Sequence, residues 1–143
     1  MKYLTPEDYA KLFGDMSEEE QESFHVVLLD SQLQIMGRRK LVSLGTSDAC
    51  LVHPVDIFRE AIRKNAKRIV IVHTHPSGNV HPSEQDQDVI HHLRKAAEIL
   101  LIELVDFLII AGQDYWSWQE HEDQERHGLL GMTITKENHH EHQ

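Results

Sequence analysis

The protein has 143 residues, 40% of them hydrophobic, and a formal net charge of −10 at pH 7. This length suits a single domain with its own core, and the acidic balance argues against direct nucleic-acid binding, which needs clustered Lys and Arg. The lone cysteine, Cys50, excludes an internal disulfide, fits a reducing compartment and is expected to be a small buried residue. The N-terminal residues lack an apolar signal-peptide core, and Glu103 and Asp106 interrupt the longest apolar stretches, so we expect a soluble cytoplasmic protein without a membrane span.

The N-terminal residues are predicted to be helical. The sequence TPED at residues 5–8 is typical of a helix start, with a capping threonine, a proline in the first turn and acidic residues near the positive end of the helix dipole. The sequence SEEE at residues 17–20 repeats the capping pattern and indicates a helical turn over residues 18–22. We therefore expect residues 1–20 to form an N-terminal helical extension.

A strand pair and a second helix are predicted next. Residues 25–29 and 32–44 carry the aliphatic and β-branched side chains of two strands, separated by a turn at residues 30–31. The dipeptide at residues 53–54, His-Pro, is predicted to begin a helix. Three apolar side chains recur on it at helical spacing and are expected to face the core: Val55, Phe58 and Ile62.

The middle of the chain reads as a buried strand, a loop and a long helix. Residues 68–72 are predicted to form the strand and residues 76–79 the loop. Serine at position 83 with aspartate three residues later has the form of a helix N-terminus. The expected buried face of this helix consists of Val89, Leu93, Ala96, Ala97 and Leu100.

The C-terminal third completes the predicted fold. Residues 104–110 indicate a strand, 112–114 a turn and 115–118 its hairpin partner. Strands alternating with helices, and hairpins at both ends, predict an α/β domain with a mixed β-sheet flanked by helices. The domain should cover residues 21–121, and residues 122–143 are expected to form a flexible tail.

The stretch HTHPSGNVHPSEQD at residues 73–86 carries the candidate chemistry. Residues i and i+2 of a strand point to the same side, so His73 and His75 can present two imidazoles to one point. Asp86 would be a third zinc ligand if its helix starts beside the strand end, which leaves one coordination position for water. Ser83 would then lie near that position and donate a hydrogen bond to a developing oxyanion. A general base is also needed, and periodicity alone does not choose among Glu18, Glu19, Glu20, Glu22 and Glu60.

Other readings of these histidines fit less well. A metallo-β-lactamase-like site would require H-x-H-x-D-H, but Ser and Gly occupy positions 77 and 78. His121 and His127 lie too far apart for the H-E-x-x-H helix of a zincin. His81 would be either an exposed loop residue or a substrate contact. The C-terminal histidines at 139, 140 and 142 would bind metal adventitiously.

The spacing H-x-H, seven residues, Ser, two residues and Asp resembles the JAMM (MPN-plus) metalloprotease motif, and HPSGxxxPSxxD resembles the RadC family in particular. The resemblance extends from Glu22 to Glu120, through ESFHVVLLD, HPVDIFREAIRKNA and DYWSWQE. It implies one JAMM/MPN-like, cytidine-deaminase-like domain with His73, His75 and Asp86 as zinc ligands, Ser83 as the oxyanion partner and Glu22 as the general base. Three positions depart from the family pattern: Thr74 for asparagine, Phe107 for histidine and His121 for glycine.

The resemblance implies a zinc-dependent metallopeptidase or isopeptidase that hydrolyses an amide with metal-bound water. Its partner would be a peptide or isopeptide substrate. The alternative is a non-catalytic, zinc-containing interaction module associated with DNA repair or mobile-element proteins, which would bind a protein partner. A metal-dependent nuclease is a third reading, against which the net charge of −10 argues. The physiological substrate and the oligomeric state are not predicted.

Overall fold

The structure is a computed structural model that describes residues 4–13, 22–44, 53–76 and 78–126. Within these ranges, five strands form one mixed sheet in the order β2-β1-β3-β4-β5. Their bounds are Ser23–Leu29 for β1, Lys40–Leu44 for β2, Arg68–Thr74 for β3, Glu103–Ala111 for β4 and Asp114–Ser117 for β5. Only β3 and β4 run parallel among the named pairs; the other neighbours are antiparallel. The predicted α/β domain with a mixed sheet is confirmed.

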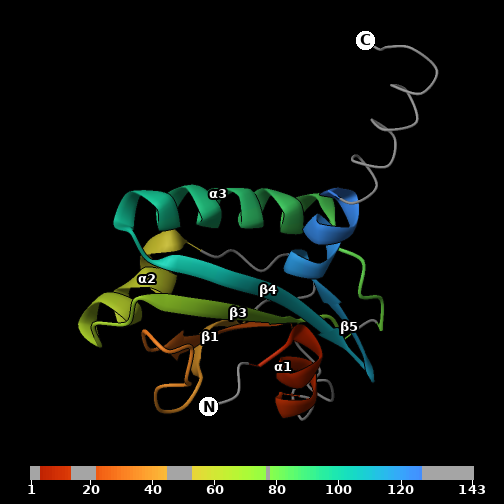
Figure 1. Cartoon of the computed structure of the whole chain (residues 1–143). Coiled ribbons are helices and arrows are strands. Elements are labelled where there is room, and N and C mark those ends of the chain that lie inside the picture. Colours follow the sequence, from red (N-terminus) through yellow and green to blue (C-terminus); the bar gives the residue numbers. More distant parts are fainter. Residues whose placement is uncertain (1–3, 14–21, 45–52, 77, 127–143) are drawn as a thin grey trace, which may run out of the picture.

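Helices cover both faces of this sheet (Figure 1). On one face lie α2, Pro54–Arg63, and α3, Glu84–Leu100, and α3 connects the parallel strands β3 and β4. Their apolar side chains form the larger core with alternate residues of β1, β3 and β4. On the other face, α1, Pro6–Leu12, packs through Tyr9 on a second core that includes Val70 and Leu108. The central strands are therefore buried on both faces, as continuous apolar runs predict.

The predicted helix starts are confirmed, and those of α1 and α3 are capped by side chains. Thr5 caps α1 in a reciprocal box with Asp8: its Oγ1 accepts from the Asp8 N–H at 3.2 Å, and Asp8 Oδ2 accepts from the Thr5 N–H at 2.9 Å. Pro54 opens α2 after His53, and Ser83 caps α3. Of the predicted helical turn at residues 18–22, residues 18–21 lie outside the described residues, as does Cys50, and Glu22 is not helical.

Two predicted helix faces are partly wrong. In α2, Val55 and Ile62 are 60% and 58% exposed, while Ile57, Phe58 and Ala61 are buried. Apolar residues occupy both stripes of this helix, so spacing alone could not choose the one that meets the sheet. In α3, Leu93 and Ala97 are buried as predicted, but Ile90 is buried instead of Leu100, and Val89 and Ala96 are half-buried.

The predicted strand over residues 32–44 is shorter in the structure and begins only at Lys40. A tight turn precedes it, because Asp30 Oδ1 accepts hydrogen bonds from the N–H groups of Gln32 and Gln34 at 2.8 and 3.0 Å. Leu33 adopts a left-handed conformation with φ of 65° within this turn. A local side-chain hydrogen bond of this kind competes with strand pairing.

The last described segment, residues 118–126, is helical, so the prediction of a strand reaching Trp118 is wrong at its end. Ser117 caps this segment: its Oγ accepts from the Glu120 N–H at 3.1 Å and donates to Asp106 Oδ2 at 2.7 Å. Residues 127–143, which include most of the predicted tail, lie outside the described residues. None of the helices in the described ranges has the length and apolar character needed to cross a membrane.

Candidate metal centre

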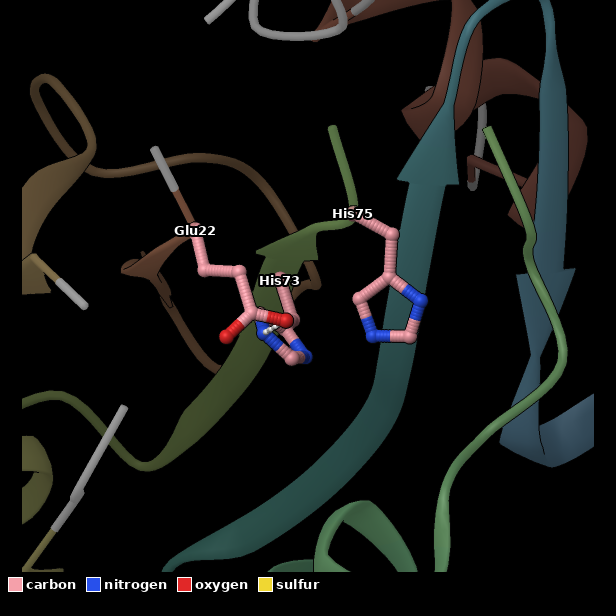
Figure 2. Close-up of side chains that lie close together, drawn as sticks. All are labelled: Glu22, His73 and His75. Carbon is pink, nitrogen blue, oxygen red and sulfur yellow. Dashed lines mark ion pairs between the residues drawn. The ribbon is translucent and has the colours of Figure 1, made fainter. Parts of the chain in front are cut away.

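The sheet places Glu22 beside the two histidines of the H-x-H motif. Because β1 and β3 are antiparallel and pair Phe24 with His73, the start of β1 meets the end of β3. Glu22 immediately precedes β1, and His75 immediately follows β3. Ligand atoms of Glu22, His73 and His75 all lie within 4.8 Å of one another. Figure 2 shows the Glu22 carboxylate directed towards the His73 ring, with Oε1 3.9 Å from Nε2, and the His75 ring alongside.

Asp86 approaches both imidazoles from the first turn of α3. Its Oδ1 lies 3.3 Å from His73 Nδ1, and its Oδ2 lies 3.0 Å from His75 Nε2. The side chain of Asp86 is 7% exposed, whereas that of Glu22 is 36% exposed. The structure thus brings the three predicted ligands and the predicted base to one place, with a buried carboxylate on one side of the imidazoles and a more accessible one on the other.

The surroundings of His73 suit a metal ligand. The ring is buried, stacks on Phe24 at a centroid distance of 3.9 Å and meets the edge of Phe107, the residue that replaces a histidine of the family pattern. Neither ring nitrogen has a hydrogen-bond partner within the described part of the chain. Buried polar atoms without partners are costly and rare. A cation bound to a ring nitrogen would remove this cost, so the site fits a metal ion.

His75 is oriented by the loop that follows it. Its Nδ1 lies 2.7 Å from the backbone oxygen of Asn79, which makes Nδ1 a protonated donor and turns Nε2 towards Asp86. A backbone carbonyl that holds the second nitrogen of a histidine is common around metal ligands. Nothing in the local sequence pattern predicted this role of Asn79.

Ser83 and Asp86 are joined in a capping box. Ser83 Oγ accepts from the Asp86 N–H at 3.0 Å, and Asp86 Oδ2 accepts from the Ser83 N–H at 2.9 Å. The Ser-x-x-Asp spacing therefore has a structural explanation that needs no metal. The cap uses the serine oxygen as an acceptor, so its hydroxyl proton can still be donated, and the oxyanion role of Ser83 stays a prediction.

The charges of the centre favour an ionised Asp86. Burial alone would raise its pKa, but the neighbouring imidazoles of His73 and His75, together with the Ser83 N–H, hold the pKa well below its usual range. For His75, burial would lower the pKa, and the interaction with Asp86 and the Asn79 carbonyl outweighs it and raises the pKa. A carboxylate must be ionised to bind a divalent cation, and Asp86 is held in this state between the two imidazoles.

A buried hydroxyl network on the opposite side of β3 was not predicted. The Ser23 N–H donates to Thr74 Oγ1 at 2.9 Å, the two hydroxyl oxygens are 3.0 Å apart, and His25 Nε2 lies 3.0 Å from Ser23 Oγ. Thr74 lies between His73 and His75, and Ser23 follows Glu22. The threonine that departs from the family pattern thus ties the segment that carries Glu22 to the segment that carries both imidazoles.

The remaining candidates lie away from this cluster or outside the described residues. Glu60 is on α2 and forms an ion pair with Arg63 at 3.5 Å. Glu18, Glu19 and Glu20 lie outside the described ranges. Of the two candidate glutamates within the described residues, Glu22 is the one that the structure brings to the histidines.

Comparisons with known proteins identify the class and then the family. The candidate metal cluster lies where the ends of β1 and β3 meet in a mixed α/β sheet, and residues 3–124 match the sequence profile of the RadC-like JAB domain. The chain is 44% identical over 101 residues to a UPF0758 protein of Thermotoga maritima, covering 71% of this chain and 45% of that protein. It is 41% identical over 108 residues to UPF0758 protein CT0611 of Chlorobaculum tepidum, covering 76% and 48% respectively.

The protein belongs to the RadC-like JAB domain family. The chain spans about half the length of the curated relatives that it matches; for the UPF0758 protein CD630_11440 of Clostridioides difficile, which is 38% identical over 120 residues, the share is 51%. JAB domains include metalloisopeptidases. The predicted family and fold are confirmed, and the residues Glu22, His73 and His75 form a possible metal-binding triad.

Proposed function

We propose that the protein is a zinc-dependent metallohydrolase of the JAMM type that cleaves an amide or isopeptide bond. The observation that carries this proposal is that the carboxylates of Glu22 and Asp86 converge on two imidazoles, those of His73 and His75. The His73 ring is buried, and its nitrogens have no hydrogen-bond partner within the described residues. Membership of a family that includes metalloisopeptidases supports the reaction class.

His73, His75 and Asp86 would hold the metal. Two imidazoles and one carboxylate form a ligand set typical of catalytic zinc, which keeps a further position open. Bound zinc would polarise the scissile carbonyl and lower the pKa of water to about 7. Asp86 is preferred to Glu22 as the ligand because both of its oxygens face the imidazoles and its side chain is buried.

Glu22 would act as the general base and then as the general acid. Its carboxylate lies beside the imidazoles but remains 36% exposed, so it can meet both water and substrate. It would accept a proton from the attacking water and deliver it to the leaving amine. Ser83, which is exposed at the start of α3, would donate its hydroxyl proton to the developing oxyanion.

The test compares two glutamate variants in a background where His139, His140 and His142 are replaced by alanine, so that zinc stoichiometry reports on the centre alone. Glu22→Gln should lower kcat/KM towards a panel of peptides and isopeptides by about 100-fold or more, the usual contribution of general acid–base catalysis, while zinc remains bound. Glu60→Gln is the matched control and should leave both unchanged. Absence of zinc from this background would contradict the proposal. Zinc binding without hydrolysis of any substrate would favour the non-catalytic interaction module instead.

A further inference from the structure

A hollow of about 650 Å³ lies beside the loop that joins β3 to α3. We call it the tryptophan pocket. Its lining includes Trp116 from β5, Trp118 from helical residues 118–126, Ile90 from α3, and His81 and Pro82 from the loop. The volume lies within the range of about 300–1,000 Å³ found for ligand pockets.

The pocket is lined by aromatic rings and by an arginine guanidinium group that lies over one of them. The Arg94 guanidinium carbon lies 4.7 Å from the centroid of the Trp118 ring, and the Trp116 and His121 rings are 5.6 Å apart. Both tryptophans are only half-buried. The opposite charges of Arg94 and Glu122 in the lining give it little net charge, which favours a neutral occupant. Half-exposed tryptophan rings bind apolar and aromatic groups favourably.

The imidazoles of the tryptophan pocket do not make it a second metal centre. Three of its lining residues are histidines, namely His81, His91 and His121. Within the described ranges, Glu22, His73 and His75 are close enough to share a metal ion, and none of the pocket histidines belongs to this group. These histidines therefore offer ring surface for packing against a ligand rather than a metal site.

One loop connects the tryptophan pocket to the metal centre. The carbonyl of Asn79 holds His75 Nδ1 at 2.7 Å, and the side-chain oxygen of the same residue accepts from the His81 N–H at 3.0 Å. Pro82, which lines the pocket, directly precedes Ser83. A substrate held at Ser83 would therefore meet the pocket wall one residue away.

We propose that the tryptophan pocket is a specificity pocket that receives the neutral aromatic side chain of a peptide residue near the scissile amide. This rests on the proposed function for its link to hydrolysis. An aromatic side chain buries about 150–250 Å² of surface, and the pocket offers it the faces of Trp116 and Trp118 next to the loop that orients His75. The preference for aromatic residues would be set by the pocket, and the reaction by the metal centre.

The two tryptophans make a direct test possible. The chain contains 2 tryptophans, and both line the pocket, so intrinsic tryptophan fluorescence reports on this site alone. The test uses the 143-residue Glu22→Gln protein with zinc, which should not turn over its ligand. It is titrated with the blocked peptide Ala-Ala-Phe-Ala-Ala and with its all-alanine analogue. We expect a saturable fluorescence change with the phenylalanine peptide and a Kd at least tenfold below that of the alanine peptide.

A matched pair of histidines provides the structural control. His91 and His92 are adjacent and exposed on α3, but only His91 lines the tryptophan pocket. His91→Glu should weaken binding of the phenylalanine peptide about tenfold or more, because a carboxylate in the pocket disfavours an apolar group, whereas His92→Glu should leave the Kd unchanged. Equal Kd values for the two peptides, or equal effects of the two substitutions, would overturn the proposal.

The outcomes distinguish a failure of the pocket proposal from a failure of the proposed function. Selective binding of the phenylalanine peptide, without hydrolysis of any peptide by the wild-type protein, would support the tryptophan pocket and contradict the proposed function. Hydrolysis with no side-chain preference and no fluorescence change would support the function and overturn the pocket.

Discussion

Asp86 at the start of α3 and Asp106 beside the start of helical residues 118–126 are both buried carboxylates that accept hydrogen bonds from backbone N–H groups at a helix start. Their pKa values are shifted in opposite directions from the ordinary value of an aspartate. The two imidazoles beside Asp86 hold its pKa below its usual range in spite of burial. Burial raises the pKa of Asp106 from 3.8 to about 6, although hydrogen bonds from Gln119, Ser117 and Phe107 stabilise its ionised form.

The difference shows what marks Asp86 as a functional residue. Burial and helix capping are common to both sites, so neither feature identifies a ligand. Only Asp86 faces imidazole nitrogens, at 3.3 and 3.0 Å, and neither nitrogen of the His73 ring has a hydrogen-bond partner within the described residues. Partnership with histidines, rather than burial, therefore separates the candidate metal centre from a structural cap.

The largest expected effect concerns the pH dependence of stability. Because the pKa of Asp106 is higher in the folded protein, folding takes up a proton between pH 3.8 and about 6. The contribution of Asp106 to the free energy of unfolding should therefore be most favourable below this window and fall by about 3 kcal/mol as pH rises through it. Denaturant unfolding at a series of pH values should show this fall in the wild type but not in Asp106→Asn.

The same titration separates the two aspartates. The lowered pKa of Asp86 stabilises the fold above its ordinary value of 3.8, and this contribution is lost as pH falls below that value. Asp86→Asn should therefore keep the fall between pH 3.8 and about 6. A fall of equal size in Asp106→Asn and the wild type would contradict the assignment to Asp106.

The second expected effect is on zinc affinity. Asp86→Asn retains an oxygen that can accept the Ser83 N–H but removes the charge beside the imidazoles, so it should weaken zinc binding by about 100-fold or more, beyond the usual effect of losing a residue that only supports a ligand. Asp106→Asn should leave zinc affinity unchanged. Competition with a chelator of known affinity measures both, and equal losses in the two variants would remove the distinction between the sites.

The smallest expected effect compares the capping serines. Ser83→Ala and Ser117→Ala each remove an oxygen that accepts a helix N–H, at 3.0 and 3.1 Å, which should cost about 1 kcal/mol of stability. Ser117→Ala should cost more in total, because it also removes the hydroxyl that donates to buried Asp106. Only Ser83→Ala should also lower kcat, because an oxyanion donor acts in the transition state. Thermal unfolding and steady-state kinetics on the same samples test this, and an equal loss of kcat in both variants would reduce Ser83 to a structural cap.

Local patterns predicted most of the fold. The runs at residues 25–29, 68–72 and 104–110 are strands because β-branched and aliphatic side chains fill both of their faces. The starts of α1 and α3 were predicted because their caps involve residues only three positions apart. The buried stripe of α2 was not, since its apolar residues allow two orientations and only contact with the sheet selects one.

The candidate site likewise contains residues that local patterns predicted and residues that they did not. His73, His75, Ser83 and Asp86 were found because strand alternation and the helix cap are short-range features. The choice of Glu22 depended on resemblance, and its physical basis is the pairing of Phe24 with His73 across the sheet. The contact between Ser23 and Thr74 spans 51 residues, and the contact between Asp106 and Ser117 crosses a hairpin, so neither is visible in a local pattern.

A crystal structure with zinc bound, with the ion located by its anomalous scattering, would determine which residues hold the metal. We expect one ion coordinated by His73, His75 and Asp86, with the Glu22 carboxylate nearby but not bound to it. An ion held by Glu22 while Asp86 remains only a helix cap, or no ion at these histidines, would contradict this expectation.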